Sequence, residues 1–485
     1  MRRCLWVTVV LFVVSVISVP ASFAGAISTL RWSSWFGAQS DDAGAVAVTP
    51  DGSTVVTTGS TATALGSDVM TSAFEAISGR RLWQAPFDGP AHGDDAGRSI
   101  AVTPDGGTII VLAGIAGSDT KRDIAVVAYQ ASDGTLLWST RLDGRAHKDD
   151  FPGSLALSPD GGTAFVVATF RNGPHHGPDL GVVALETSTG TASWRAGFNG
   201  PVSSRQRKPY DTGEVITVDP DGTRVYVSGS SSFHVAERGV TFVTIGLDAG
   251  TGARLWKNRG PIYQCGGYWP QAMTIVPDGS TVVATGYAGD GCNAFFEGFL
   301  TMGYDASSGD QTWMEYSTDY SNIGPGSVAI EATSDGTEII QTGMQISLDY
   351  DTSPDYGTIA YRPDGSTSWW HDYDGVTTDM PYADDEATDL TIVPGSNDVI
   401  VIGSSKRYSV DDDGTYTGGP WDGLTVAYSE TGALLWTSLF LDPVSGGDVY
   451  PEAIAPAPDG SAIYVAGSGE TATGGWNAFV VSYAI

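Results

Sequence analysis

The chain has 485 residues, of which only 16% are charged, and its 56 acidic residues against 24 basic ones give a net charge of −32. Such an acidic body repels nucleic acid and anionic membrane surfaces, so neither is expected as a partner. The same charge attracts cations and basic partners, although surface acid also serves simply to keep a secreted protein soluble.

Residues 1–26 have the pattern of a secretory signal peptide. Arg2 and Arg3 precede an apolar stretch from Leu5 to Val19, and the small residues at 24–26 are typical of a cleavage site. The apolar stretch is short for a membrane span, and no other long one follows, so no membrane insertion is expected. We therefore predict a secreted protein, extracellular or periplasmic, with residues 27–485 as a single domain.

A unit seen from Asp94 to Trp138 repeats along the rest of the chain. It has four short apolar runs, at 100–102, 108–112, 124–129 and 136–138, with the spacing of strands rather than of helices. The first two runs are joined by Pro104-Asp105-Gly106, a turn in which proline presets the first position and glycine takes positive φ. Each unit is therefore predicted to be a four-stranded antiparallel sheet.

Two markers count these units. The closing tryptophans are Trp32, Trp83, Trp138, Trp194, Trp256, Trp313, Trp370 and Trp436, and the first turn recurs at Pro50, Pro104, Pro159, Pro220, Pro277, Ser334, Pro394 and Pro458. Both sets have eight members, which predicts an all-β fold, an eight-bladed β-propeller of four-stranded antiparallel blades. The tryptophans are expected to pack between neighbouring blades as core residues.

The two ends of the chain complement each other. The last unit ends at Ile485 after its third run, 479–483, and has no fourth. The segment Leu30-Arg31-Trp32-Ser33 matches the fourth run of the unit described above. Residues 29–36 are therefore predicted to complete the last blade, which closes the ring and hides two sheet edges.

The unit ending at residues 248–256, which recurs at 431–436, resembles the pyrroloquinoline-quinone-like (PQQ-like) repeat of bacterial propellers. Families with eight such blades include the quinoprotein alcohol dehydrogenases and an outer-membrane assembly lipoprotein. The resemblance implies the fold, because these residues build turns and blade packing. The dehydrogenases have a vicinal cysteine pair over the quinone, whereas no two cysteines are adjacent here. Their calcium ligands and a C-x-x-C-H motif also have no match, so no quinone cofactor is expected.

Cysteine usage predicts one structural bridge. Cys4 lies in the predicted signal peptide, which leaves Cys265 and Cys292. In an oxidising compartment two cysteines favour a disulfide. Closing that loop contributes about 3–4 kcal/mol in the chain-entropy model.

The loops of such a blade divide between two faces. The connections before each first strand share one face with the second-to-third loops, and the uniform turns occupy the other. Variable loops on a rigid ring are where function usually lies. These connections carry repeated acids: Asp41-Asp42, Asp94-Asp95, Asp149-Asp150, Asp211, Asp384-Asp385 and Asp448. Two interpretations stay open: a ring of carboxylates that binds a cation or cationic ligand, or aspartates that accept backbone N–H bonds within their own connections.

Histidines suggest a sharper metal site within this face. His92 with Asp94 and Asp95, His147 with Asp149 and Asp150, and the pair His175 and His176 fall in one sector. Imidazoles beside carboxylates can hold zinc or another transition metal, although loop histidines are commonly just solvated.

Calcium is the candidate ion at two acidic loops. Asp349, Asp351 and Asp355 alternate as in a calcium loop, but Pro354 stands where an EF-hand needs glycine. Asp411, Asp412 and Asp413 lie in the longest of these loops, and a solvated surface loop is the alternative at both places.

The chain has no G-x-S-x-G, H-E-x-x-H, phosphate-loop or dinucleotide motif. We predict a monomeric binding or scaffolding module with a protein or glycan ligand on the acidic loop face. Two enzymatic alternatives stay open: a metal-assisted hydrolase or lactonase that uses the carboxylates and histidines, and a quinone-dependent dehydrogenase, which the cysteines disfavour.

Overall fold

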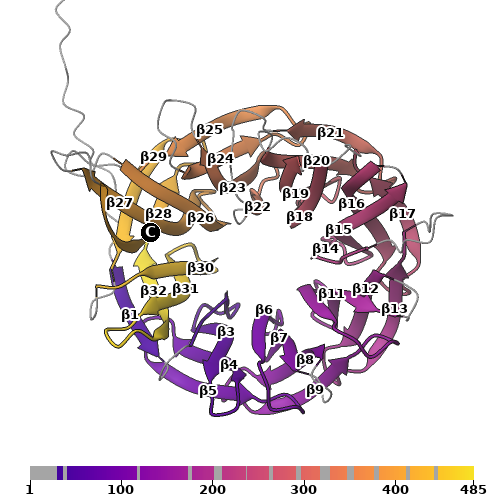
Figure 1. Ribbon diagram of the computed structural model, residues 1–485, viewed down its shortest axis with the longest axis horizontal. Coiled ribbons are helices and arrows are strands. Elements are labelled where there is room, and N and C mark those ends of the chain that lie inside the picture. Colours follow the sequence, from indigo (N-terminus) through magenta and orange to yellow (C-terminus); the bar gives the residue numbers. More distant parts are fainter. Residues whose placement is uncertain are drawn as a thin grey trace, which may run out of the picture.

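A computed structural model describes residues 30–36, 41–116, 121–172, 177–200, 210–235, 237–261, 266–290, 297–316, 328–346, 354–375, 382–410, 416–441 and 446–485. Within these ranges the chain forms eight four-stranded antiparallel sheets arranged as blades around one axis (Figure 1). The described residues contain no helix long and apolar enough to cross a membrane. The predicted eight-bladed β-propeller is confirmed.

The strands run in chain order from the inner to the outer edge of each blade. Blade 1 contains β2 (Ala45–Val48), β3 (Thr54–Ala62), β4 (Ser67–Glu75) and β5 (Arg81–Phe87). Blade 2 contains β6 (Ala96–Val102), β7 (Thr108–Ala116), β8 (Arg122–Gln130) and β9 (Leu136–Leu142). Blade 3 contains β10 (Phe151–Leu157), β11 (Thr163–Arg171), β12 (Pro178–Glu186) and β13 (Ala192–Phe198). Blade 4 contains β14 (Val215–Val218), β15 (Arg224–Val235), β16 (Glu237–Asp248) and β17 (Arg254–Arg259).

The other half of the ring follows the same order. Blade 5 contains β18 (Gly266–Ile275), β19 (Thr281–Asp290), β20 (Glu297–Asp305) and β21 (Gln311–Tyr316). Blade 6 contains β22 (Val328–Ala332), β23 (Ile339–Ile346), β24 (Pro354–Tyr361) and β25 (Thr367–Tyr373). Blade 7 contains β26 (Tyr382–Ile392), β27 (Val399–Val410), β28 (Tyr416–Tyr428) and β29 (Leu434–Phe440). Blade 8 contains β30 (Val449–Pro456), β31 (Ala462–Glu470), β32 (Trp476–Ala484) and, as its outer strand, β1 (Leu30–Phe36).

The N-terminal strand closes the ring as the sequence predicted. Strand β1 pairs antiparallel with β32, with Trp32 opposite Ser482 and Phe36 opposite Ala478. Figure 1 shows the first and last coloured segments side by side in this blade. Pairing the two ends of the chain leaves no open seam between blades 8 and 1.

The turn chemistry explains the first hairpin of the blades that have an Asp-Gly turn, which is every blade except blade 7. In blade 1, Asp51 Oδ1 accepts hydrogen bonds from Thr49 Oγ1 at 2.6 Å and from the Ser53 amide at 3.0 Å. Gly52 takes a φ of 70°, a conformation that favours glycine. The turn therefore forms from its own four residues, whatever the loops at the other end contain.

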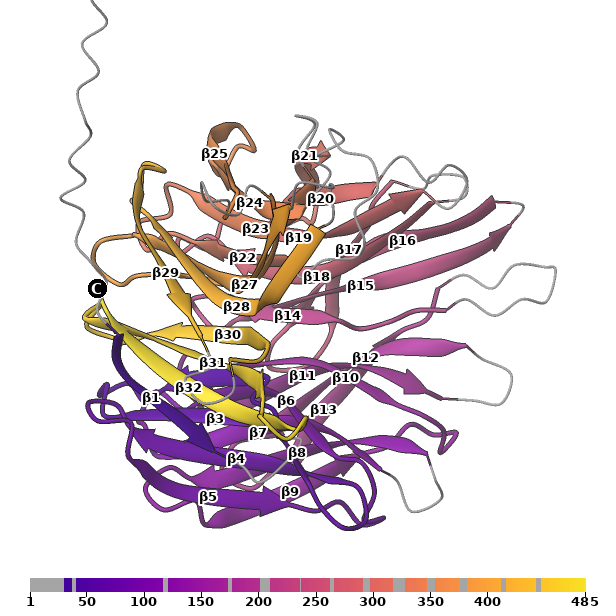
Figure 2. The ribbon, with the colours of Figure 1, turned by 60° about the vertical axis from the view of Figure 1, so that its left-hand side comes forward.

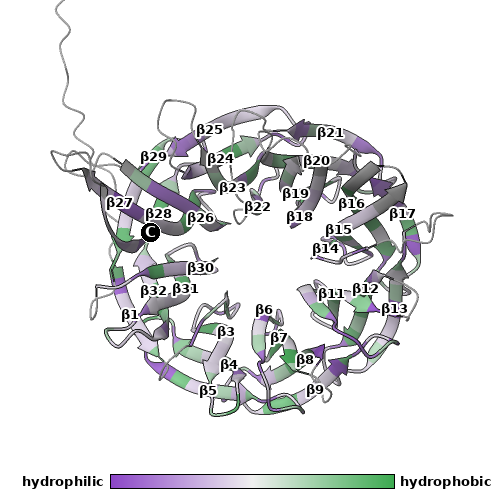
Figure 3. Cartoon of the chain, in the orientation of Figure 1, coloured by the Kyte–Doolittle hydropathy of each residue, from purple (hydrophilic) through white to green (hydrophobic). Residues whose placement is uncertain are grey.

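The core lies between successive blades. One cluster joins Ile110, Leu112 and Val126 of blade 2 to Val166 and Val183 of blade 3, and all five are almost fully buried. The middle strands β8 and β12 show green, apolar stretches in Figure 3, whereas the outer strand β5 alternates between green and purple. Burial on both faces explains why the middle strands are nearly continuous apolar runs.

The closing tryptophans bind each blade to the next. Six indoles donate from Nε1 to a carbonyl in the last turn of the following blade at 2.8–2.9 Å: Trp32 to Ala76, Trp83 to Ala131, Trp138 to Thr187, Trp194 to Ala249, Trp256 to Ala306 and Trp313 to Pro363. Trp436 packs on Tyr483 with ring centroids 6.4 Å apart.

The predicted marker of blade 6 is wrong by one residue. Trp370 is 56% exposed, and it is Trp369 whose Nε1 donates to the Glu430 carbonyl at 3.1 Å. In the turn before β25, the Arg362 amide donates to the carbonyl of Ser366, four positions later, whereas in blade 1 the Glu75 amide donates to the carbonyl of Arg80, five positions later. Because this turn is one residue shorter, the side chain that faces the core is that of Trp369 and not that of Trp370.

Candidate functional site on the acidic face

The acidic connections and the second-to-third loops meet at one end of the ring. The Asp95 amide, before the first strand of blade 2, donates to the Ser67 carbonyl of β4 at 2.7 Å. Asp95 Oδ1 accepts from the Ala116 amide, at the end of β7, at 2.7 Å. We call this end the acidic face and the other, with its Pro-Asp-Gly turns, the turn face. The hairpin β15–β16 projects on the acidic face at the right of Figure 2.

Five aspartates of this face are buried, which favours the structural interpretation for them. Their exposed fractions are 3% or less: Asp41, Asp95, Asp150, Asp211 and Asp385. Asp150 shows the pattern, since its Oδ2 accepts from the Gly144 amide at 2.5 Å and its Oδ1 from the Arg171 amide at 2.7 Å. Asp95, Asp150 and Asp211 each tie the end of one blade to the next blade in this way. Burial raises the pKa of Asp150 to about 6, because desolvation outweighs these hydrogen bonds.

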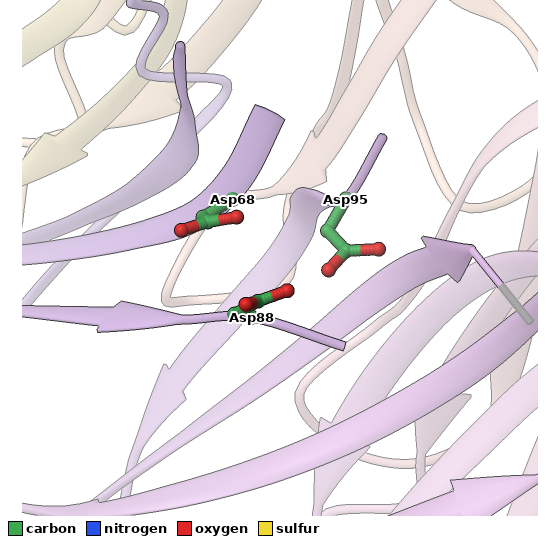
Figure 4. A group of neighbouring side chains, drawn as sticks. All are labelled: Asp68, Asp88 and Asp95. Atoms are coloured by element: carbon green, nitrogen blue, oxygen red, sulfur yellow. The ribbon is translucent and has the colours of Figure 1, made fainter. Parts of the chain in front are cut away.

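Three of the buried aspartates belong to groups of three carboxylates. Asp68 of β4, Asp88 after β5 and Asp95 turn toward one another in Figure 4, with one oxygen from each within 4.8 Å of the others. The equivalent groups are Asp123, Asp143 and Asp150 in blade 2 and Asp355, Asp374 and Asp385 in blade 6. The sequence analysis missed Asp68 and Asp88 in the first group, Asp123 and Asp143 in the second, and only Asp374 in the third. The Asp-Gly pairs at 88–89, 143–144 and 374–375 nevertheless repeat at equivalent positions.

The histidines are not members of these groups of three, but each contacts one carboxylate of a group. His92 Nδ1 lies 2.5 Å from Asp88 Oδ2 and His147 Nδ1 lies 2.6 Å from Asp143 Oδ2, each within its own loop. Both imidazoles are largely exposed, and both residues have positive φ, 53° and 48°. Hydrogen bonding to Asp88 and its charge raise the pKa of His92. Among the described residues, each of the two histidines therefore contacts an aspartate of its own loop, and the two do not form one site.

The blade 2 carboxylates already have a cation. Arg141 Nε donates to Asp123 Oδ2 at 2.8 Å, and its Nη2 lies 3.3 Å from Asp143 Oδ2. Of the other predicted ligands, Asp94 is exposed, and Asp149 Oδ1 accepts from the Arg122 amide at 3.1 Å. Metal binding on this face stays a prediction, which trace-metal analysis of the purified protein would test.

Several predicted residues lie outside the described part of the chain: His175, His176, Asp349, Asp351, Asp411, Asp412, Asp413, Cys265 and Cys292. Of the predicted calcium loops only Asp355 is described, buried at 6% exposure within the blade 6 group. Calcium at these loops and the disulfide stay predictions.

A row of aromatic rings on the acidic face was not predicted. Trp421 of β28, Tyr450 of β30 and Trp476 of β32 are partly exposed. The rings of Trp421 and Tyr450 have centroids 6.2 Å apart, and those of Tyr450 and Trp476 are 5.6 Å apart. They do not belong to the tryptophans that close the blades. No repeat signal could have found them, because only blades 7 and 8 have tryptophan at this position.

Carboxylates surround this aromatic row. Trp421 donates its amide to Asp448 Oδ1 at 2.9 Å, and Tyr450 Oη lies 3.4 Å from Asp448 Oδ2. Burial, followed by the charge of Asp448, raises the pKa of Tyr450 to about 12, and Glu386 adds to this effect. Burial also raises the pKa of Glu452, with a further contribution from the charge of Asp42. Asp42, Asp448 and Glu452 thus lie together in this sector of blades 7, 8 and 1, where Lys406 lies over the Trp421 ring.

Comparisons with known proteins agree with this architecture. The family model described as outer membrane protein assembly factor BamB matches residues 65–243 and 177–322, which together span more than half of the chain. No curated protein matches the sequence.

Solved structures share the fold at low identity. BamB from Moraxella catarrhalis is 14% identical over 95% of this chain and 98% of its own, with a TM-score of 0.44. Quinohemoprotein alcohol dehydrogenase from Comamonas testosteroni is 13% identical over 94% and 76%, with a TM-score of 0.53. Sqt1 from Chaetomium thermophilum, bound to the N-terminus of the ribosomal protein L10, is 12% identical over 93% and 98%, with a TM-score of 0.55. The chain is a PQQ-like repeat propeller and belongs to the family of the outer membrane protein assembly factor BamB.

Proposed function

We propose that this propeller is a protein-binding module that holds a basic segment of a partner against the acidic face of blades 7, 8 and 1. The observation that supports it is the excess of partly exposed carboxylates around the aromatic row, with Asp42, Glu386, Asp448 and Glu452 in one sector. Aromatic rings and carboxylates together suit lysine and arginine side chains.

The charge of the face favours a protein over a glycan as the ligand. A neutral glycan would use the aromatic rings but would leave the carboxylates without counter-charges, whereas a basic peptide engages both. Sqt1 offers a precedent of the same general fold, because it was solved with the N-terminus of a ribosomal protein. That precedent concerns Sqt1, and for this chain the support comes from the charges and rings of its own face.

A peptide-binding assay tests the proposal. A fluorescently labelled oligo-arginine peptide is expected to bind the purified protein with an affinity that falls as salt is added, whereas an oligo-glutamate peptide of equal length is not. Charge reversal distinguishes binding at this site from the general electrostatic attraction between a basic peptide and an acidic protein. The double variant Glu386→Lys/Glu452→Lys is expected to weaken binding about 10-fold or more, through loss of attraction and new repulsion.

The matched control is Glu430→Lys, which changes an exposed residue of the turn face. Equal weakening by the control and by the acidic-face variant would contradict the proposal, as would retention of the protein on a glycan array without any peptide binding.

A further inference from the structure

A cavity of about 240 Å³ lies where blade 8 meets blade 1, at the junction closed by the N-terminal strand. Its lining consists of Asp41, Asp42, Glu452, Ser468 and Trp476. Trp476 begins β32 of blade 8, and Asp42 belongs to the connection that enters blade 1. The cavity thus combines an indole with three carboxyl groups on the acidic face.

The same place at another junction holds a cation supplied by the chain. Between blades 2 and 3, the Arg122 guanidinium lies over the Phe151 ring, 5.9 Å from its centroid. Arg122 is the first residue of the third strand of blade 2, as Trp476 is of the third strand of blade 8. Phe151 directly follows the buried Asp150, as Asp42 directly follows the buried Asp41. In blade 7, Lys406 Nζ lies 5.7 Å from the Trp421 ring centroid. Ring and cation are therefore paired at one other junction, and again within blade 7 on the acidic face.

The junction between blades 8 and 1 has the ring and the anions without such a cation. Within the part of the chain that the structure describes, no lysine or arginine forms an ion pair with Asp42 or Glu452 or lies over the Trp476 ring. The charge of Arg98 lowers the pKa of Glu452, but this is the smallest of several effects, and the pKa of Glu452 is raised overall. A bound cation would remove this repulsion between carboxylates.

The carboxylates are held in position before any ligand arrives. Asp42 Oδ1 accepts from the Ser60 amide at 2.5 Å, and Glu452 Oε1 accepts from Ser468 Oγ at 3.0 Å. Each carboxylate thus has one oxygen in a hydrogen bond that fixes the orientation of its side chain. A Cβ at Gly44 would lie 3.5 Å from Glu452 Oε2, so the missing side chain leaves space beside that oxygen. Preorganised acceptors reduce the entropy that binding costs.

We infer that this cavity binds the cationic head of an arginine or lysine side chain from the partner, over the Trp476 indole and between Asp42 and Glu452. The inference rests on the proposed function and specifies where on the acidic face the basic segment is anchored. Arginine fits the arrangement best, because its planar guanidinium can lie on a ring while its N–H groups reach two carboxylates.

Three variants test the anchor with the labelled oligo-arginine peptide at fixed salt. Trp476→Leu keeps an apolar side chain but removes the ring, and is expected to weaken binding about 3- to 10-fold. Glu452→Gln keeps the shape and the bond to Ser468 but removes the charge, and is expected to weaken binding about 10-fold. Glu430→Gln removes the same charge from the turn face and is expected to leave the affinity unchanged. Thermal midpoints show that each variant is folded.

The peptide supplies the reciprocal control. Replacing arginine by citrulline keeps the shape of the side chain and removes its charge, so binding to the wild-type protein is expected to be lost. Wild-type affinity in both Trp476→Leu and Glu452→Gln would overturn the anchor while leaving the proposed function intact. Failure of the wild-type protein to bind oligo-arginine would overturn both.

Discussion

Glu331 Oε2 accepts a hydrogen bond of 2.9 Å from the backbone amide of Ile392, which belongs to the inner strand of the next blade. Asp389 repeats this arrangement one blade on, since its Oδ2 accepts from the Ile454 amide at 3.1 Å. Inner strands on the axis are thus joined by acidic side chains. Burial raises the pKa of Glu331 and of Asp389 to about 7 each, and the charge of Asp389 adds to the effect on Glu331.

These raised pKa values predict how stability depends on pH. From about pH 4, near the ordinary carboxyl values, up to about 7, the folded chain holds protons that the unfolded chain has released. The free energy of unfolding is therefore expected to fall as pH rises through this window, by several kcal/mol for the pair. Urea unfolding at pH 5 and pH 8 measures it. The double variant Glu331→Gln/Asp389→Asn should show a shallower dependence, and an unchanged dependence would contradict this assignment.

The buried aspartates of the acidic face predict a contrast between two neighbouring residues. Asp95 accepts backbone hydrogen bonds from Gly89 and Ala116, whereas the adjacent Asp94 is exposed. Asp95→Ala leaves two amides without their acceptor and is expected to lower the free energy of unfolding by about 2–4 kcal/mol. Asp94→Ala is the control, with an expected change below about 0.5 kcal/mol. Similar urea midpoints for the two variants would show that Asp95 does not tie the blades together.

The two tryptophans of blade 6 predict a second contrast. Trp369 packs beside Tyr428, with ring centroids 5.9 Å apart, and donates to the Glu430 carbonyl, whereas Trp370 faces solvent. Trp369→Ala is expected to lower the free energy of unfolding by about 3–5 kcal/mol, and Trp370→Ala by less than about 0.5 kcal/mol. Urea unfolding compares them, and the reverse order would restore the assignment made from the sequence.

The cysteines predict an effect of reduction. Cys265 precedes Gly266 by one residue and Cys292 follows Asp290 by two, and Gly266 pairs with Asp290 at the ends of β18 and β19. Both cysteines lie outside the described residues, and the bridge stays a prediction. Thiol titration of the denatured, unreduced protein is expected to find neither thiol free. Reduction, or Cys265→Ser/Cys292→Ser, is expected to cost about 3–4 kcal/mol. Two free thiols would rule the bridge out.

The fold could be predicted because the same local sequence signals recur in each blade. The Pro-Asp-Gly turns close through their own side chains, and the spacing of tryptophans such as Trp138 counts the blades. The closure of blade 8 followed from a segment missing at one end and present at the other. Trp370 was assigned wrongly because Trp369 and Trp370 are adjacent and of the same type. Which of them faces the core depends on the length of the preceding turn, and the sequence pattern does not reveal that length.

The site was less predictable, because charge in a loop does not reveal burial. Asp94 and Asp95 are the same residue type, and only the fold places one in solvent and the other against two amides. The groups that include Asp68 and Asp88 join residues from three strands or connections, so no local pattern contains them. Trp421 and Trp476 look like ordinary strand residues until the ring brings them to the same sector of the acidic face.

The proposed basic segment binds over the acidic face of blades 7, 8 and 1, and the most direct measurement locates where it binds. An oligo-arginine peptide that carries a photo-crosslinking group would be irradiated with the full-length protein, and the cross-linked residues identified by mass spectrometry. Cross-links are expected near Trp421, Tyr450 and Trp476, and they are expected to be lost when citrulline replaces arginine. Cross-links concentrated on the turn face, near Pro50 or Pro104, or spread evenly around the ring, would contradict it.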